Sequence, residues 1–296
     1  MAETASEWTD FGAFEQDAWT RQAEGYAAHF GNVVGQVIEP LLDAAEVEPG
    51  SDLLDVACGP GHGAAAGARR GARVVGLDFS EAMITIARGQ FPWLRFERGD
   101  ALDLPFDDNS FDAVTINLGM LHFAEPQRAL REAWRVLKPG GAVAFTDWAP
   151  PGPNNVAYDI LVSAVDRHAT PFRLPPGPPP YQFADPDRCR EVLGEAQFDP
   201  KSVRTSTIPL LWRLPSPEAL PAAFRDGSAR LGARIKAQTP DRWRAILAEV
   251  RRDSRPYLTE SGAAVPTGIA LTSARKPSRL DGLPARNVSP LRRAGG

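Results

Sequence analysis

The residues best suited to chemistry stand at the ends of two neighbouring apolar segments. Residues 53–57 (LLDVA) indicate a buried strand, and the glycine-rich run CGPGHG follows at once at positions 58–63. Asp78 ends the next apolar segment, residues 74–78. Glycines let a backbone turn sharply with no Cβ between it and a ligand, and an acidic residue at the following strand end can accept from ribose hydroxyls. The spacing predicts a site for an adenosine-bearing cofactor.

The rival cofactor is a nicotinamide dinucleotide, whose pyrophosphate sits on a helix N-terminus at a G-x-G-x-x-G turn. Here the glycines alternate, at positions 59, 61 and 63. None of the tyrosines at positions 26, 158, 181 and 257 has a lysine four residues later, so the tyrosine–lysine pair of short-chain dehydrogenases is missing. These features favour a cofactor that carries no phosphate.

Strand-like and helix-like segments alternate along the chain around this turn. Such alternation implies parallel strands joined by right-handed crossovers, and therefore a doubly wound α/β sheet. The further strands expected are 94–98, 110–117, 141–147, 203–211 and 268–273. The helices expected are 14–28, 33–45 (bent or interrupted at Pro40), 64–70, 80–90, 127–137, 156–168, 187–196, 217–236 and 241–257.

Four successive segments resemble the signature motifs of class I S-adenosylmethionine-dependent methyltransferases. They read LLDVACGPG, VVGLDFSEAMI, GDALDLPFDDNSFDAV and EAWRVLKPGGAVAF, and they begin at residues 53, 74, 99 and 132. The resemblance extends over about residues 15–275 and is greatest to the small-molecule branch that includes the ubiquinone and menaquinone methyltransferases. One departure is Ala57, which stands where the motif has its first glycine.

The resemblance implies a Rossmann-like, mostly parallel seven-stranded sheet with a reversed final hairpin. Residues 1–46 would form an N-terminal helical cover, and residues 47–150 would form the cofactor-binding core. Residues 151–275 would supply helical insertions that form a cap, together with the last strands of the same sheet. Residues 276–296 lack periodicity and are expected to be a disordered tail.

The resemblance also implies that S-adenosylmethionine is the cofactor and S-adenosylhomocysteine the product. Asp55 would reach the methionine ammonium, and Asn117 would offer its carbonyl to the same group. Tyr26 would close over the methionine end of the cofactor. Asp78 would accept hydrogen bonds from the ribose hydroxyls.

A second group of residues is implied for the adenine end. Phe79 would pack on the adenine ring, Asp100 would accept from its amino group, and the N–H of Ala101 would bond a ring nitrogen. Gly59 and Gly61 would let the backbone approach the cofactor closely. The whole set expected to bind the cofactor is Tyr26, Asp55, Ala57, Gly59, Gly61, Asp78, Phe79, Met83, Asp100, Ala101 and Asn117.

A general base is needed if the acceptor atom is a phenol oxygen or a carbon, whereas a free amine needs none before attack. His122 is the candidate, because it lies five residues beyond Asn117 on the segment that leaves the fourth strand. The alternative is a histidine that packs under the cofactor and bonds a backbone carbonyl. His168 and Asp147 are weaker candidates for a functional role. The four histidines show no metal-ligand spacing, so no catalytic metal is expected.

The function predicted is methyl transfer from S-adenosylmethionine to a small, apolar or aromatic acceptor, at oxygen, nitrogen or carbon of a quinone precursor or secondary metabolite. The alternative is a non-catalytic or repurposed protein that binds the same cofactor. Proline-rich residues 173–186 predict a lid over the site. The aromatic residues Phe172, Tyr181, Phe183 and Trp212 predict an enclosed apolar pocket. The sequence leaves the acceptor and the oligomeric state open.

Composition and charge argue against several other classes. The net charge of −4 is uneven: residues 1–150 hold 11 Lys and Arg against 23 Asp and Glu, and residues 151–296 hold 22 against 14. No lysine-rich tract indicates a nucleic acid partner, and the fourth strand ends in NLGM, unlike the tetrad of base-modifying amino-methyltransferases. No apolar run approaches the ~20 residues of a membrane span, and the N-terminus shows no secretion signal. With two separate cysteines and no disulfide framework, the protein is expected to be cytoplasmic.

Overall fold

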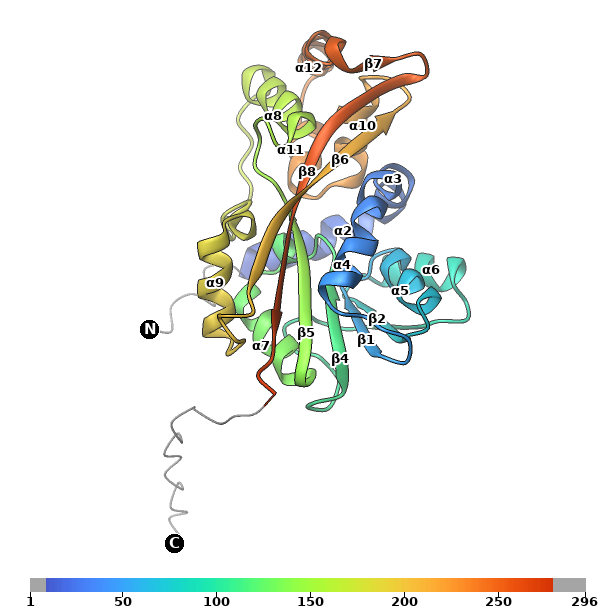
Figure 1. The fold of residues 1–296 in the computed structure, drawn as a ribbon. Coiled ribbons are helices and arrows are strands. Elements are labelled where there is room, and N and C mark those ends of the chain that lie inside the picture. Colours follow the sequence, from blue (N-terminus) through green and yellow to red (C-terminus); the bar gives the residue numbers. More distant parts are fainter. Residues whose placement is uncertain (1–8, 279–296) are drawn as a thin grey trace, which may run out of the picture.

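A computed structural model of the protein describes residues 9–278, and one mixed sheet forms its centre (Figure 1). The strand order is β3-β2-β1-β4-β5-β8-β6, with β7 paired to β8. Strands β1 to β5 run parallel, whereas β8 is antiparallel to both β5 and β6. The strands are β1 (Asp52–Val56), β2 (Arg73–Asp78), β3 (Arg95–Arg98), β4 (Phe111–Ile116), β5 (Leu137–Trp148), β6 (Arg204–Leu214), β7 (Leu258–Thr259) and β8 (Gly262–Arg275).

The predicted doubly wound sheet with its reversed final hairpin is confirmed, but the strand count differs. The sheet has eight strands, not seven, because the two residues of β7 pair with the start of β8. The last two long strands also extend further than predicted, since β6 and β8 stay paired as far as Leu214 and Ala263. Trp212 and Val265 in this extension are buried in the apolar cluster of the cap. The extension therefore carries the cap, seen in the upper part of Figure 1.

Helices cover both faces of the sheet. Leu53 and Leu54 of β1 are both fully buried, because neighbouring residues of a strand point to opposite faces. On the first face, Leu53 packs in an apolar cluster with side chains of α4 (Ile38–Ala44), α5 (His62–Arg69) and α6 (Glu81–Gln90). On the second face, Leu54 packs in a cluster with side chains of α7 (Pro126–Val136) and α9 (Pro186–Glu195).

The N-terminal cover consists of one long helix and a broken one. Helix α2 (Thr9–His29) contacts α6 of the core and α10 (Ala219–Gly227) of the cap. It is followed by α3 (Gly31–Val34), a 3₁₀ turn (Gly35–Val37) and α4. The predicted interruption is confirmed, although it falls just before Pro40, which lies in the first turn of α4, where an N–H has no intrahelical partner.

The cap helices stand on the extended ends of β6 and β8. Helix α8 (Val156–His168) has the predicted bounds. The prediction of a single helix over 217–236 is wrong, because the helix is interrupted between α10 and α11 (Arg230–Lys236). Helix α12 (Pro240–Asp253) and a 3₁₀ turn (Arg255–Tyr257) complete the cap. An irregular segment runs from the end of α8 to a 3₁₀ turn (Gln182–Ala184) that precedes α9.

Lys276, the first residue of the predicted tail, is anchored in the core. Its side chain is buried, and Nζ donates to the carbonyls of Trp134 and Leu137 and to Oδ1 of Asn109. The Nζ atom also lies 4.0 Å from the centre of the Trp134 ring. Most of the predicted tail, from residue 279 on, lies outside the described residues.

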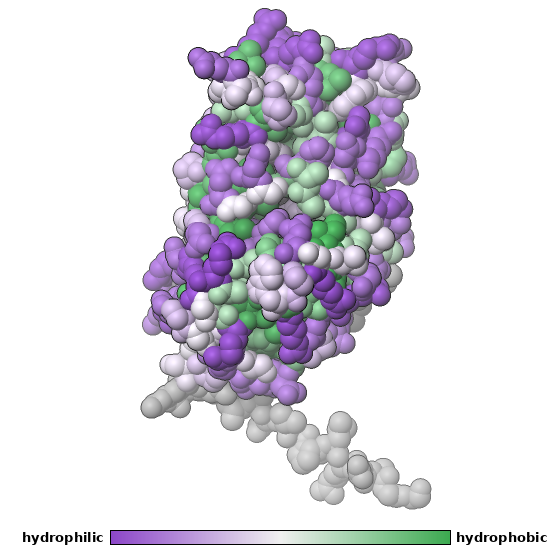
Figure 2. Space-filling view, turned by 90° about the vertical axis from the view of Figure 1, so that its right-hand side faces the viewer, coloured by the Kyte–Doolittle hydropathy of each residue, from purple (hydrophilic) through white to green (hydrophobic). Residues whose placement is uncertain are grey.

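Apolar residues are dispersed over the side of the molecule seen in Figure 2, where hydrophilic residues dominate and small hydrophobic groups lie between them. The large apolar side chains that stand exposed in the described part of the chain are Trp93, Phe172 and Leu258. They belong to different segments, and single exposed apolar residues are ordinary on a protein surface. Over residues 9–278, none of the helices combines the length and the apolar character that a membrane crossing requires.

Candidate active site

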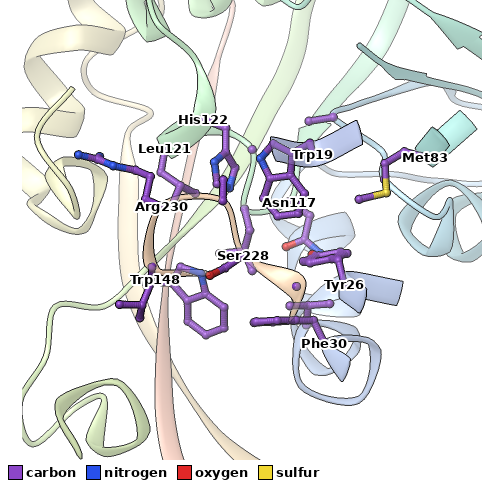
Figure 3. A pocket seen from close by; sticks show the side chains of 18 of the residues that line it. Trp19, Tyr26, Phe30, Met83, Asn117, Leu121, His122, Trp148, Ser228 and Arg230 are labelled. Carbon is purple, nitrogen blue, oxygen red and sulfur yellow. The ribbon is translucent and has the colours of Figure 1, made fainter. Parts of the chain in front are cut away.

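A cavity of about 330 Å³ lies between the carboxyl ends of the central strands, α2 and the cap (Figure 3). Because β2, β1 and β4 are parallel neighbours, the residues that follow them meet at the same edge of the sheet. The sequence-predicted residues that line this cavity are Tyr26, Asp55, Ala57, Gly59, Asp78, Phe79, Met83, Asn117 and His122.

Three of the residues expected to bind the cofactor do not line the cavity: Gly61, Asp100 and Ala101. Gly61 stands before the first residue of α5 with φ +87°, and a Cβ there would lie 2.7 Å from the Phe96 ring, so packing accounts for this glycine. Asp100 Oδ1 accepts from the N–H of Leu102 at 2.9 Å, and Ala101 is buried in the core. Their contacts with adenine therefore stay predictions.

Asp78 ties the glycine turn to the end of β2. Its Oδ2 accepts from the N–H of Gly59 and its Oδ1 from the N–H of Ser80, both at 2.9 Å. Burial raises the pKa of the Asp78 carboxyl to about 6. A carboxylate offers about four acceptor positions, so this one keeps capacity for donors of a ligand in the cavity.

Asp55 is the second buried carboxyl of the cavity. Its Oδ1 accepts from Oγ1 of Thr115 at 3.0 Å. A Cβ on Gly63 would stand 2.7 Å from its Oδ2, so only glycine lets α5 begin beside the carboxyl. Burial raises the pKa of Asp55 to about 7, and no Lys or Arg of the described residues pairs with it. A buried carboxylate without a cation provides a site for a positively charged ligand.

Three non-glycine residues on the cavity wall have a left-handed backbone. They are Ala57 (φ +53°), Leu118 (φ +55°) and Tyr181 (φ +61°). This conformation costs roughly 1–2 kcal/mol in a residue with a Cβ, and such strain gathers at functional sites. Ala57, the departure from the motif, thus keeps a conformation that glycine would adopt freely.

His122 ends a 3₁₀ turn (Met120–His122) that follows β4, and it lines the cavity. Its Nδ1 is 2.9 Å from Oε2 of Glu15, and the Nε1–H of Trp19 donates to the same oxygen at 3.1 Å. Glu15 was missed by the sequence analysis. Its spacing of four to Trp19 places both on one face of α2, but nothing in the sequence connects it to a histidine 107 residues away.

The weaker candidates lie elsewhere. His168 bonds the buried carboxyl of Glu249 in α12 and does not line the cavity. Asp147 is buried in β5, where its Oδ1 accepts from the N–H of Trp148 at 2.8 Å, and burial raises its pKa to about 7. Asp147 does not line the cavity either. From residue 9 to residue 278, no three His, Cys, Asp or Glu side chains are grouped so that they could hold a metal ion.

The side of the cavity toward the cap is mostly apolar and aromatic, although Arg230 and Arg234 also belong to the lining. Trp148, Tyr158 and Phe224 line it. The ring centroids lie 6.2 Å apart for Trp148 and Tyr158, 5.2 Å for Tyr158 and Phe224, and 6.4 Å for Trp148 and Phe224. Phe30 lines the same region from the end of α2, as Figure 3 shows. Apolar surface of this kind binds flat, apolar molecules, because burial removes both surfaces from water.

The predicted aromatic pocket is correct in kind but wrong in most of its members. Only Tyr181 of the four predicted residues lines the cavity. Phe183 and Trp212 are buried in core clusters, and Phe172 is 42% exposed. Composition shows that a segment is rich in aromatic residues, but it does not show in which direction their side chains point.

Comparison with known proteins identifies the family. Residues 54–145 match the family model described as a methyltransferase domain. A demethylmenaquinone methyltransferase of Paenarthrobacter aurescens is 41% identical over 227 residues, which make up 73% of this chain and 81% of that protein. The chain belongs to the S-adenosylmethionine-dependent methyltransferases.

Other relatives of this methyltransferase match over shorter stretches. A 2-phytyl-1,4-naphtoquinone methyltransferase of Synechocystis is 39% identical over 169 residues, which are 47% of this chain and 69% of that protein. Demethylmenaquinone methyltransferases of Clavibacter sepedonicus and Renibacterium salmoninarum are 44% and 43% identical over 121 and 120 residues. The chain spans about half the length of these two relatives, 49% and 51%.

Solved structures agree on the fold. A putative methyltransferase of Bacillus halodurans superposes with a TM-score of 0.52 at 22% identity, covering 82% of this chain and 100% of that one. The [4+2]-cyclase SpnF superposes with a TM-score of 0.50 at 25% identity, covering 82% of each chain. The methyltransferase fold is therefore shown for the sheet and its surrounding helices.

The cavity of this methyltransferase fits its cofactor. S-adenosylmethionine carries a positive sulfonium and a positive ammonium group, and the buried carboxyls of Asp55 and Asp78 supply negative charge to the cavity. Gly59 leaves the backbone of the turn open toward the cavity, where the atom closest to an added Cβ would be 4.0 Å away, on Tyr26.

Proposed function

We propose that the protein transfers the methyl group of S-adenosylmethionine to an apolar, aromatic acceptor of the quinone-precursor class. One observation carries this proposal: a single cavity joins buried carboxyls on the side of the sheet to a wall of aromatic rings on the side of the cap. The names of the demethylmenaquinone and phytylnaphtoquinone relatives support the same acceptor class.

The chemistry of the acceptor defines what the protein must do. S-adenosylmethionine supplies an electrophilic methyl group when it is bound. A quinone ring is electron-poor, so the acceptor must enter as its reduced dihydroxy form, and loss of a hydroxyl proton makes its ring more nucleophilic. We assign that proton to Nε2 of His122: the acceptor O–H bond breaks, an N–H bond forms, and the electron pair stays on the acceptor.

The cap would position the acceptor ring. Trp148, Tyr158 and Phe224 form an apolar wall that can enclose an aromatic ring and keep water away from the reacting atoms. Residues 173–186 would act as a lid, since Leu174 and Pro180 from this segment also line the cavity. Proteolysis within the lid should become slower when acceptor and product are both bound, and an unchanged rate would contradict this role.

The predicted cofactor contacts remain part of the proposal. Asp55, Tyr26 and Asn117 would hold the methionine end, and Oγ1 of Thr146 donates to Oδ1 of Asn117 at 2.7 Å, which fixes that side chain. Burial raises the pKa of Tyr26, which keeps its hydroxyl neutral beside Asp78. Together with the ribose contact of Asp78, these residues would orient the cofactor.

The test uses the purified protein with S-adenosylmethionine carrying a deuterated methyl group. Demethylmenaquinol and reduced 2-phytyl-1,4-naphthoquinone are supplied under anaerobic conditions, with the oxidised quinones as matched controls. We expect mass spectrometry to show the labelled methyl on the reduced acceptors and none on the oxidised ones. If the cofactor binds in calorimetry but neither reduced acceptor gains label, the acceptor class is wrong.

A second candidate is a repurposed protein that binds the cofactor without transferring its methyl group. The similarity to the [4+2]-cyclase SpnF favours it. The same experiment separates the two candidates: a repurposed protein would convert its substrate to a product that contains no label.

We also propose a cytoplasmic location and a small-molecule acceptor. Cys58 and Cys189 are both buried and free, as expected of a protein from a reducing compartment. Fractionation of cells that express the full chain would test the location, and recovery in a secreted fraction would contradict it.

A further inference from the structure

Glu15 hydrogen-bonds the candidate base His122, although no motif of the sequence identifies it. We propose that Glu15 is a positioning residue for His122: it holds the imidazole with a proton on Nδ1, so that Nε2 is free to accept the proton of the methyl acceptor. This inference rests on the proposed role of His122 as the base.

The contacts of His122 support this arrangement. Its Nδ1 is 2.9 Å from Oε2 of Glu15, and the described residues provide no hydrogen-bond partner for Nε2. A carboxylate can only accept, so Nδ1 carries the hydrogen, and in the neutral imidazole Nε2 then keeps its lone pair. Because His122 also lines the cavity, the unprotonated nitrogen belongs to a side chain that a ligand can reach.

Trp19 fixes the carboxyl of Glu15. Its Nε1–H donates to the same Oε2 at 3.1 Å. The Trp19 ring also meets the His122 ring edge to face, with centroids 4.8 Å apart, and Figure 3 shows the two side by side. Trp19 and His122 line the cavity, and Glu15 connects them through its Oε2.

The burial of Glu15 is difficult to explain by stability alone. Only 1% of the residue is exposed, and its Oε1 has no hydrogen-bond partner among the described residues. Burying a carboxylate without a cation is unfavourable. That unfavourable charge becomes useful when His122 takes a proton, because the carboxylate then faces an imidazolium ion.

Other acidic groups face the same histidine. Asp78 at the end of β2 and Asp147 in β5 both interact electrostatically with His122. Glu15 differs from them because it alone hydrogen-bonds the ring. In the proposed step the proton moves from the acceptor hydroxyl to Nε2, the Nδ1–H stays with the histidine, and Glu15 keeps its charge. After product release Nε2 returns the proton to water.

Two variants separate the charge of Glu15 from its hydrogen bond. Glu15→Gln removes the charge and keeps an acceptor, and Glu15→Leu removes both. We expect kcat for a reduced naphthoquinone acceptor to fall about 10–100-fold in Glu15→Gln and further in Glu15→Leu, with cofactor affinity unchanged. The matched control is Glu24→Gln, an exposed glutamate on the same helix, which should leave kcat unchanged.

A double-variant comparison tests whether Glu15 acts through His122. In a His122→Asn background, Glu15→Gln should cause no further loss of kcat. If the two losses multiply, Glu15 has a separate structural role and the proposal is wrong.

The pH dependence gives a second readout. Removing a negative charge next to an imidazolium makes that ion less stable, so the acidic limb of the kcat profile should move to lower pH in Glu15→Gln. It should stay in place in Glu24→Gln. A lower kcat with an unmoved acidic limb would contradict the proposal.

A third measurement needs no acceptor, so it stands even if the proposed function fails. Nitrogen-15 NMR of the histidine rings, with the His122 signals assigned by their loss in His122→Asn, reports which nitrogen carries the hydrogen. We expect the Nδ1–H form in the native protein with S-adenosylhomocysteine and a shift toward the Nε2–H form in Glu15→Leu. A native His122 with hydrogen on Nε2 would overturn the proposal.

Discussion

Two histidine–carboxylate pairs in this protein have opposite surroundings. Glu15 and Glu249 are both buried, with 1% and 3% of each residue exposed. Glu249 accepts from Arg167 and His168 of α8 and lies 3.3 Å from Arg252 of its own helix. Among residues 9–278, Glu15 has only His122 and the neutral Trp19 as partners.

The difference between the pairs extends to the regions around them. His168 and Glu249 join α8 to α12, and the two arginines beside Glu249 give this pair a surplus of cations, which is the arrangement of a structural ion cluster. Asp55 and Asp78 line the cavity, and Glu15 bonds the cavity residue His122; no Lys or Arg of the described residues pairs with any of the three carboxyls. Negative charge left without a partner is suited to a ligand that brings positive charge, whereas a neutralised cluster is suited to stability.

The largest expected effect separates the two histidines. His122→Asn keeps a polar side chain but removes the base, so turnover of a reduced naphthoquinone should fall ~10²–10⁴-fold with little change in melting temperature. His168→Asn should lower the melting temperature and leave turnover per folded molecule unchanged. Steady-state kinetics and thermal melting on both variants decide the matter. If the two variants behave alike, the comparison between the pairs is wrong.

The next effect concerns cofactor binding. Asp78→Ala should weaken S-adenosylmethionine binding by about 1.5–3 kcal/mol, or about 10–150-fold, because a charge-assisted hydrogen bond is lost. Isothermal calorimetry measures this directly. Asp241→Ala, which removes an exposed partner of Arg244 in the cap, away from the cavity, is the control and should leave the affinity unchanged. Equal affinity of Asp78→Ala and the native protein would reject the ribose assignment.

The cap cluster should matter for folding alone. Glu249→Gln leaves Arg167, His168 and Arg252 without their shared carboxylate. We expect the free energy of unfolding to fall by about 1–3 kcal/mol, less than for a fully buried pair, because Arg167 and Arg252 are largely exposed. Urea denaturation gives the value. Turnover per folded molecule should be unchanged, and a loss of turnover without a loss of stability would contradict the division between the two regions.

Local patterns in the sequence were sufficient for the core of the site. The turn after β1 and the position of Asp78 follow from glycines and a carboxylate at fixed spacing, and the helix predicted over 80–90 begins where Ser80 caps α6 by accepting from the N–H of Met83. These features depend on residues within a few positions of one another. Their geometry is set by the backbone of one strand–turn–helix unit, which a single sequence shows directly.

The parts that the sequence could not show depend on distant packing. Glu15 meets His122 only because α2 folds across the edge of the sheet, and the two residues are 107 positions apart. Phe183 and Trp212 were expected in the pocket, but they fill the core, since side-chain direction in an irregular segment and a long hairpin depends on the surrounding helices. The sequence made His122 the stronger candidate by its position after the fourth strand, but the same limit hid the carboxylate partners of both His122 and His168.

The smallest expected effect is a pH dependence of stability. It tests whether the cavity carboxyls lack a cation that would stabilise their ionised form. Burial raises the pKa of Asp55 from 3.8 to about 7 and that of Asp78 to about 6. A raised pKa means that the folded protein holds the proton more tightly than the unfolded chain, so this contribution to stability is fully present below the unfolded value and is lost as the pH rises through about 6 to 7.

The melting temperature of the cofactor-free protein should therefore fall by a few degrees between about pH 5 and pH 8. The side chain in Asp55→Asn cannot ionise, so this variant should show a smaller fall in melting temperature. Part of the fall should remain, because burial also raises the pKa of Asp147 to about 7. Bound S-adenosylmethionine should oppose the fall, because its positive groups stabilise the ionised carboxylates. The cap variant Glu249→Gln should melt lower at every pH with the native slope. A slope that is as steep in Asp55→Asn as in the native protein, or one that Glu249→Gln reduces instead, would show that the uncompensated charge does not lie in the cavity.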